Sequence, residues 1–130
     1  MKKIRCIIID DEPLAINILE EYIEKIEFLE LLQSFSNAVT AINYLQDNKV
    51  DLIFLDINMP VLGGFEFLES LASMPFVIIT SAHEEYALKS YEVAAIDYLV
   101  KPISFPRFLR SAQRVNGLVD TEKEASQRTK

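Results

Sequence analysis

Polar residues stand at the points where the apolar runs of this chain end, and their types suit one kind of chemistry. Clustered carboxylates are ligands for a hard cation, and Mg²⁺ in particular uses few of them, keeps waters and pairs with phosphate. A lysine can meet a phosphoryl oxygen as a point charge, a hydroxyl can donate to another, and a carboxylate can itself be phosphorylated. The residues in question are Asp10, Asp11, Glu12, Asp56, Thr80, Ser81 and Lys101.

Asp56 poses the sharpest question among them. It follows residues 50–55, an apolar run that is broken only by Asp51. A carboxylate at the exit of a buried strand is costly to desolvate unless a cation meets it. Each acid taken alone is best explained as a solvated loop carboxylate. A site is indicated only if the fold brings the acids, the hydroxyl and the lysine to one place.

The elements that would do so alternate along the chain between short apolar runs and helical patterns. Strands are expected at residues 4–9, 28–35, 51–55, 76–80 and 96–100, and helices from Pro13, from Ser36 or Asn37, at 63–71, at about 84–91 and from Ser104 through Val115. Five strands, each followed by a helix, predict a doubly wound parallel sheet with helices on both faces. In such a sheet function collects at the carboxyl ends of the strands, where the polar residues stand.

Composition bounds the class of protein. The chain has 130 residues, half of them apolar, and a net charge of −7, which argues against gripping nucleic acid electrostatically. The single cysteine, Cys6, lies in an apolar run and is expected to be a buried thiol. The apolar runs are too short to span a bilayer and the start lacks a signal-peptide core, so a cytoplasmic location is expected. Residues 1–116 are interpreted as the domain and 117–130 as a linker or disordered tail, which has little to bury.

Four separated motifs resemble one known family. "IIIDDEP", "LIFLDINMPVLGG", "VIITSA" and "DYLVKP" are similar, in the same order, to the receiver domain of two-component response regulators, over about residues 3–115. The resemblance implies a flavodoxin-like five-stranded sheet with strand order 2-1-3-4-5. It also implies a signalling domain that catalyses only its own phosphoryl transfer and autodephosphorylation.

The resemblance assigns a role to each matching residue. Asp56 resembles the phosphoacceptor, and Asp11 the direct Mg²⁺ ligand. By the same resemblance Asp56 and the backbone carbonyl of Asn58 also hold Mg²⁺, and Asp10 acts through water. Thr80 and Lys101 match the switch hydroxyl and the phosphoryl-binding lysine, and Tyr98 matches the aromatic whose rotamer follows Thr80. Pro60, Gly64 and Pro102 are expected to be structural, with Lys101–Pro102 resembling the family's cis peptide bond.

The resemblance also implies partners. A sensor histidine kinase would supply the phosphoryl group, and phosphorylation would promote a homodimer through the surface of the fourth and fifth helices. The run "YAL…YEV…DYL.KP" resembles regulators with a LytTR-type (LytR/AlgR-like) DNA-binding domain, so DNA would be bound only through a C-terminal domain absent from this chain. Asn58 and Ala82, which flank the expected approach of water, are expected to influence the phosphoryl lifetime.

Other function classes remain open at this stage. A phosphatase of the haloacid dehalogenase kind expects a second acid two residues beyond the nucleophile, where this chain has Asn58. An FMN binder expects a Ser/Thr/Gly-rich loop after the first strand, which is missing. A stand-alone receiver and a phosphorylation-independent interaction module are further alternatives, although the intact acidic set disfavours the latter. His83, the only histidine, is expected to lie in an exposed loop.

Overall fold

The computed structural model describes residues 3–128, apart from the side chains of residues 88, 90, 91 and 121–128. Strands and helices alternate along the chain, as the sequence pattern predicts. The elements are β1 (Ile4–Ile9), α1 (Pro13–Glu24), β2 (Leu29–Phe35), α2 (Ala38–Asp47), β3 (Leu52–Asp56), α3 (Gly64–Glu69), β4 (Phe76–Ser81), the 3-10 turn η1 (Glu84–Tyr86), α4 (Ala87–Glu92), β5 (Asp97–Val100) and α5 (Phe105–Arg128).

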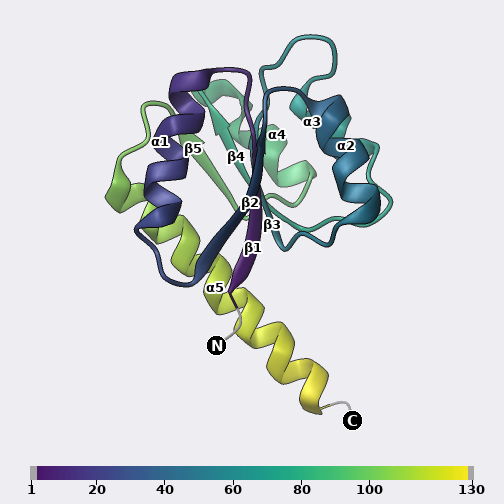
Figure 1. Ribbon diagram of the computed structural model, residues 1–130, viewed down its shortest axis with the longest axis vertical. Coiled ribbons are helices and arrows are strands. Elements are labelled where there is room, and N and C mark those ends of the chain that lie inside the picture. The colour runs from purple at the N-terminus through teal and green to yellow at the C-terminus, as the bar shows by residue number, and fades with distance from the viewer. Residues whose placement is uncertain (1–2, 129–130) are drawn as a thin grey trace.

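The five strands form one parallel sheet in the order β2-β1-β3-β4-β5, which confirms the flavodoxin-like topology. Helices α1 and α5 cover one face of the sheet, and α2, α3 and α4 lie on the other (Figure 1). Within the described part of the chain, no helix combines the length and the apolar character needed to cross a bilayer.

Two hydrophobic layers hold the helices to the sheet, and the pleat of the strands divides the residues between them. On β1, Cys6 and Ile8 point to the layer shared with α1 and α5, whereas Ile7 and Ile9 point to the layer shared with α2 and α3. All four are fully buried. Alternation with a period of two explains why a strand of a doubly covered sheet must be apolar throughout. The central strands are therefore rigid supports for whatever stands at their ends.

Local signals explain where two of the helices begin. Pro13 occupies the first turn of α1, where its missing N–H leaves no bond unmade. Asn37 caps α2, because its side chain accepts a hydrogen bond from the backbone N of Thr40 at 2.9 Å. The sequence left Ser36 and Asn37 as alternative caps, and the structure decides for Asn37.

The last helix corrects the sequence interpretation. The helix was expected to end at Val115, with a linker or disordered tail from Gly117, but α5 continues to Arg128. Val119 still packs against the hydrophobic layer next to α1, so burial extends a turn further than expected. Beyond it, Glu, Lys, Ala, Gln and Arg are good helix formers, and a helix needs propensity rather than apolar surface to continue. Residues 129 and 130 of the expected tail lie outside the described residues.

Smaller boundary differences bear on the site. Strand β3 runs one residue further than expected, so that Asp56 is its last residue rather than the first of the loop. The expected helix at 63–71 is only Gly64–Glu69, and the one at 84–91 begins as the turn η1 before α4. An acid that still belongs to the strand has its backbone held by the sheet ladder.

Candidate functional site

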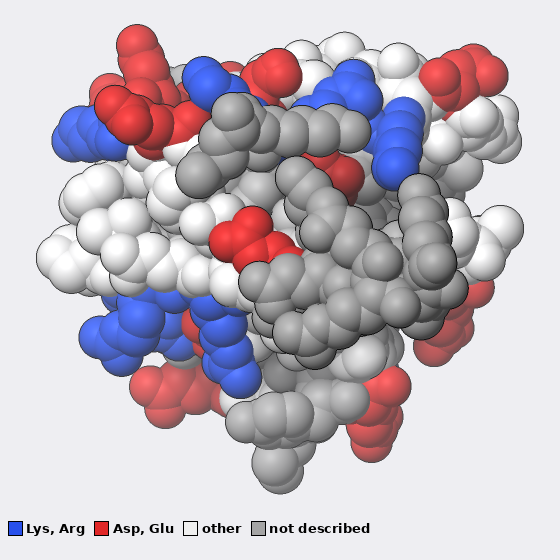
Figure 2. Space-filling model, turned by 90° about the horizontal axis from the view of Figure 1, so that it is seen from below, with Lys and Arg blue, Asp and Glu red and all other residues white. Residues whose placement is uncertain are grey.

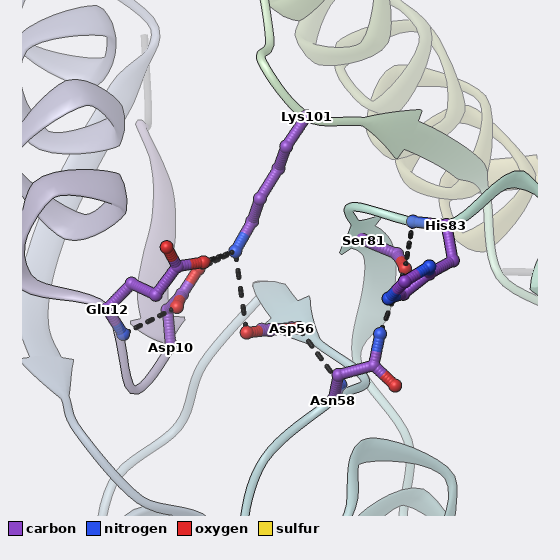
Figure 3. A network of polar contacts seen from close by, with 7 residues as sticks. All are labelled: Asp10, Glu12, Asp56, Asn58, Ser81, His83 and Lys101. Atoms are coloured by element: carbon purple, nitrogen blue, oxygen red, sulfur yellow. Dashed lines mark hydrogen bonds and ion pairs between the residues drawn. The ribbon is translucent and has the colours of Figure 1, made fainter.

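The expected polar residues meet at the carboxyl edge of the sheet. Asp10 follows β1, Asp56 ends β3, and Lys101 follows β5 and reaches back between them (Figure 3). Asp10 is fully buried and Asp56 is only 3% exposed. Two buried carboxylates from neighbouring strands require a cationic partner, because an isolated buried charge is very costly.

Lys101 is that partner. Its Nζ lies 2.9 Å from Asp10 Oδ2, 2.8 Å from Glu12 Oε1 and 3.4 Å from Asp56 Oδ2. One ammonium group therefore faces three carboxylates, and a fourth, Asp11, stands beside them. The site keeps an excess of negative charge that Lys101 alone does not neutralise.

The pKa values express this imbalance. The pKa of Asp56 is raised to about 7: burial is the largest cause and the charge of Asp10 adds to it, while the hydrogen bond from the Asn58 backbone and the charge of Lys101 act in the opposite direction. Burial opposes the charge of Lys101, but its hydrogen bonds to Glu12 and Asp10 and the nearby acids outweigh that effect and raise its pKa. The lysine is thus firmly cationic, while Asp56 titrates near neutrality in the absence of another cation.

The acids fit a divalent cation. Asp10, Asp11 and Asp56 each offer one carboxylate oxygen, and these oxygens all lie within 4.8 Å of one another. Asp11 is exposed, so a cation here would keep a side open to water, as Mg²⁺ requires. Asn58 stands next to this set, because its backbone N donates to Asp56 Oδ1 at 2.9 Å.

Thr80 and Tyr98 lie on the two strands beyond Asp56. Thr80 pairs with Asp56 in the register of β3 and β4 and is buried, yet its Oγ1 has no hydrogen-bond partner within the part of the chain that the structure describes. A buried hydroxyl without a partner is uncommon and marks a group that can donate to something else. Tyr98 is half-buried, and its hydroxyl donates to the backbone carbonyl of His83. His83 itself is exposed, as expected.

Backbone features shape the loops around the acids. The Lys101–Pro102 peptide bond is cis, as the resemblance implied. A Cβ at Gly64 would lie 2.6 Å from the Cα of Ile57, so this position admits only glycine without movement of the backbone. Pro60 is exposed in the loop between β3 and α3.

Sequence reasoning missed a group of uncharged hydrogen-bonding residues beside the acids, here called the neutral side of the site, which consists of Asn58, Ser81 and the backbone of His83. The Oγ of Ser81 accepts a hydrogen bond from Asn58 Nδ2 at 3.2 Å and another from the backbone N of His83 at 2.9 Å (Figure 3). Ser81 was noted only as a hydroxyl at the end of its strand. A small buried polar residue at a strand end is the one signal that pointed to it.

It also missed a second ion pair, close to the first in sequence. Asp97 on β5 accepts two hydrogen bonds from Arg107 of α5, at 2.7 and 2.9 Å, and another from the hydroxyl of Ser111. The available signal was the charge itself, since an acid inside the apolar run "AAIDYLV" needs a partner.

The opposite edge of the sheet carries no comparable cluster among the described residues. A hollow of about 990 Å³ lies there, lined by the end of α2, the loop between α2 and β3, the loop after α3 with the first residue of β4, and Val119. Seen from below, described acidic and basic side chains are interspersed with uncharged ones on this face (Figure 2). The candidate chemistry is confined to the carboxyl edge.

Comparisons with known proteins agree with this geometry. The family model of the response regulator receiver domain matches residues 6–113. The chain is 36% identical over 114 residues to the transcriptional regulatory protein BtsR of Escherichia coli, which covers 86% of this chain and 48% of that protein. It is 33% identical over 128 residues to the protein MrkE of Klebsiella pneumoniae, covering 96% and 48%. The chain thus spans about half the length of the curated relatives it matches.

Solved structures share the fold. The crystal structure of the response regulatory domain of MrkE has a TM-score of 0.83 at 33% identity and covers 90% of this chain and 98% of that one. The chemotaxis protein CheY4 of Vibrio cholerae, at 23% identity, has a TM-score of 0.75 over 87% and 98% and supports the fold alone. With the family model spanning both the sheet and its acidic edge, this chain belongs to the response regulator receiver domain family.

Proposed function

We propose that Asp56 accepts a phosphoryl group from the phosphohistidine of a sensor histidine kinase in a Mg²⁺-dependent reaction, and that this switches an output surface. Receiver domains of two-component systems are signalling modules that partner with sensor histidine kinases and bind Mg²⁺ at their acidic pocket. The observation that carries the proposal is the position of Lys101 Nζ, held between the buried carboxylates of Asp10 and Asp56.

The phosphoryl transfer needs positioning more than covalent chemistry from the protein. An oxygen of the Asp56 carboxylate attacks phosphorus, the P–N bond to the imidazole breaks, and its electron pair stays on the nitrogen. A proton on the other ring nitrogen lets the imidazole leave as a neutral ring. The attacking electron pair of the carboxylate becomes the new O–P bond, and the negative charge of the product lies on the phosphoryl oxygens, as it did before the transfer. Lys101 then meets one of those oxygens as a point charge, which a lysine already held 3.4 Å from Asp56 is placed to do. Autodephosphorylation, by water attacking phosphorus, belongs to the same proposal.

The metal would be held by Asp11, by Asp56 and by the backbone carbonyl of Asn58, with Asp10 acting through water. When bound, Mg²⁺ supplies positive charge that neutralises the acids and the phosphoryl oxygens together. The donor set supports this assignment, because three carboxylate oxygens converge while one lysine faces them. Asp56 would be ionised in that state, since its raised pKa reflects burial without the cation.

The switch would involve Thr80 and Tyr98. The unpartnered Thr80 Oγ1 supports a role as donor to a phosphoryl oxygen, and Tyr98 would change rotamer with it. The surface formed by α4, β5 and α5 would then change its preference for partners, including a second copy of the receiver. Pro60, Gly64 and Pro102 would hold the loops in place.

The output is proposed to be control of transcription by a LytTR-type DNA-binding domain in a longer protein. Support comes from the "YAL…YEV…DYL.KP" run and from BtsR, a transcriptional regulatory protein about twice as long as the match. In this proposal residues 1–116 form the receiver and 117–130 the connection to the output domain, and α5 makes this connection helical as far as Arg128. A cytoplasmic location, beside the kinase, is part of the same proposal.

An aspartate-nucleophile phosphatase is disfavoured by Asn58. Its side-chain amide donates to Ser81 Oγ and is not an acid that could protonate a leaving group. The test is mass spectrometry of the chain after incubation with acetyl phosphate and Mg²⁺. One phosphoryl group on Asp56 is the expected result, and a phosphoryl group elsewhere, or none, would contradict the proposal.

A further inference from the structure

The neutral side of the site contains a hydrogen-bonded bridge that the acidic side does not explain. Ser81 is fully buried at the end of β4. Its Oγ accepts from Asn58 Nδ2 at 3.2 Å and from the backbone N of His83 at 2.9 Å. Its backbone carbonyl accepts from the backbone N of Lys101 at 2.7 Å. One residue therefore contacts the three loops that follow β3, β4 and β5.

Each end of this bridge continues to a residue of the proposed switch. On one side, the backbone N of Asn58 donates to Asp56 Oδ1 at 2.9 Å. On the other, the backbone carbonyl of His83 accepts from the hydroxyl of Tyr98. Hydrogen bonds thus run without interruption from Asp56 to Tyr98, and none of them passes through Thr80.

We propose that the Ser81 hydroxyl is a positioning group that couples the state of Asp56 to Tyr98 by this second route. The inference rests on the proposed function, since it needs phosphorylation of Asp56. Whichever carboxylate oxygen is esterified, the carboxylate of Asp56 loses its own charge, and the negative charge of the modified side chain then lies on the phosphoryl oxygens. The bond from Asn58 to Oδ1 then loses its ionic acceptor, and bonds to ionised groups are roughly twice as strong as neutral ones. The loop after β3 is freed to move, and its side-chain bond to Ser81 carries the movement to His83.

A local explanation exists for half of the bridge. A serine hydroxyl often accepts from the backbone N–H two residues later, and such a turn would shape the loop after β4 by itself. The bond from Asn58, 23 residues away in sequence, is not part of any local turn. The two explanations differ in what happens at Tyr98 when the Asn58 arm alone is removed.

Ser81→Ala removes both arms and keeps the backbone bond to Lys101. The measurement is the change in backbone amide chemical shifts on adding Mg²⁺ and beryllofluoride, a phosphoryl mimic, at Asn58, His83 and Tyr98. In the variant the shift at Asn58 is expected to persist, while those at His83 and Tyr98 fall to about half or less. Asn58→Ala, which breaks only the long-range arm, is expected to reduce the Tyr98 shift as well. Ser34→Ala, the same change on β2 where the hydroxyl bonds Glu20, is the matched control and should respond as wild type.

The outcomes separate the two levels of the proposal. Wild-type shifts at His83 and Tyr98 in both site variants would overturn the Ser81 route and leave the proposed function standing. A full response in Asn58→Ala with loss in Ser81→Ala would reduce Ser81 to a local turn and also overturn it. No response of the wild type at any site residue would overturn the proposed function, and this inference with it. If thermal unfolding shows that Ser81→Ala is not folded, the Tyr98 shift in Asn58→Ala alone decides whether the Ser81 route exists.

Discussion

Two cations of this domain face acids that are wholly or largely buried, and the two cations are placed very differently. Lys101 is confronted by Asp10, Glu12 and Asp56, with Asp11 nearby. Arg107 faces one acid, Asp97, through two hydrogen bonds at 2.7 and 2.9 Å, and Ser111 donates a third. The first cluster carries an excess of negative charge, whereas the charges of the second balance.

The pKa directions follow from that difference. The pKa of Asp56 is raised to about 7, chiefly by burial and further by the charge of Asp10, because Lys101 and the Asn58 backbone do not outweigh these two causes. Burial also acts on Asp97, but the hydrogen bonds from Arg107 and Ser111 outweigh it and lower its pKa. A largely buried acid that is paired with one cation, such as Asp97, stabilises the fold. A buried acid with more acidic than cationic neighbours, such as Asp56, is a candidate for binding a cation or a phosphoryl group.

The largest expected effect that tests this comparison is that of Asp56→Asn. The variant should take up no phosphoryl group from acetyl phosphate, since the amide is not a nucleophile of this kind. It should also be more stable than wild type without Mg²⁺ at pH 7.5, by on the order of 4 kcal/mol, because a carboxylate whose pKa folding raises from 3.8 to about 7 is lost.

The change of the free energy of unfolding with pH shows the direction of this effect. Because the pKa of Asp56 rises on folding from 3.8 to about 7, wild-type stability should fall as the pH rises through that window, and the variant should lack this contribution to the fall. Urea unfolding at a series of pH values measures it. A variant that gains a phosphoryl group contradicts the assignment of Asp56 as the phosphoacceptor. A variant that is less stable than wild type at pH 7.5 contradicts the raised pKa of Asp56.

Lys101→Ala should separate phosphorylation from its consequence. Mg²⁺ affinity should stay close to wild type, because in the proposed function the lysine binds the phosphoryl group rather than the metal. The amide shifts of α4 on adding beryllofluoride should largely disappear. Titration with Mg²⁺ and the amide spectra of α4 measure the two effects, and equal α4 shifts in both proteins would remove Lys101 from the switch.

Asp11→Ala should weaken Mg²⁺ binding by at least about tenfold, equivalent to about 1.4 kcal/mol. Asp11 is the exposed member of the three residues whose carboxylate oxygens converge. Calorimetric titration measures the affinity, with Asp47→Ala at the end of α2 as a control for the lost charge. An unchanged affinity would place the cation elsewhere.

Arg107→Ala should do the reverse of Asp56→Asn. Leaving Asp97 buried without its cation should destabilise the fold by about 2–3 kcal/mol, a little less than for a fully buried pair since Arg107 is partly exposed. Phosphoryl uptake should continue. Because the pKa of Asp97 is lowered in the fold, the contribution of the pair is present at neutral pH and lost in acid, so the two proteins should converge as the pH falls.

Urea unfolding measures this loss, and Arg110→Ala, an exposed arginine on the same helix, is the matched control. We expect the two clusters to be independent. A loss of phosphoryl uptake in folded Arg107→Ala would contradict that expectation.

Glu12→Gln should have the smallest effect. The Glu12 side chain is 62% exposed, and Lys101 keeps its bonds to Asp10 and Asp56. Exposed ion pairs contribute little, so the free energy of unfolding should change by less than about 1 kcal/mol. Glu21→Gln on α1 serves as the control. A larger loss would make Glu12 a structural partner of Lys101, comparable with Asp97 and Arg107.

The order of strands and helices, and therefore which residue types meet at the carboxyl edge, could be predicted from the amino-acid pattern. Apolar runs with a period of two, alternating with helical patterns, leave essentially one parallel arrangement once connections are right-handed. That is why Asp10, Asp56 and Lys101 could be placed together without coordinates. The end of α5 escaped this reasoning, because helix propensity continued where apolar periodicity stopped.

Which atoms are in contact could be seen only in three dimensions. Periodicity gives a residue's face and end, but a hydrogen bond depends on the rotamer and on backbone placement to a few tenths of an ångström. The order of residues does not show that Glu12 contacts Lys101, or that Ser81 is hydrogen-bonded to both Asn58 and His83. Nor does it show that Asp97 is paired with a cation of its own, Arg107, whereas Asp56 shares Lys101 with other acids. Whether a buried acid is paired with a cation cannot be predicted from the sequence, because charges far apart in the chain are brought together only by folding.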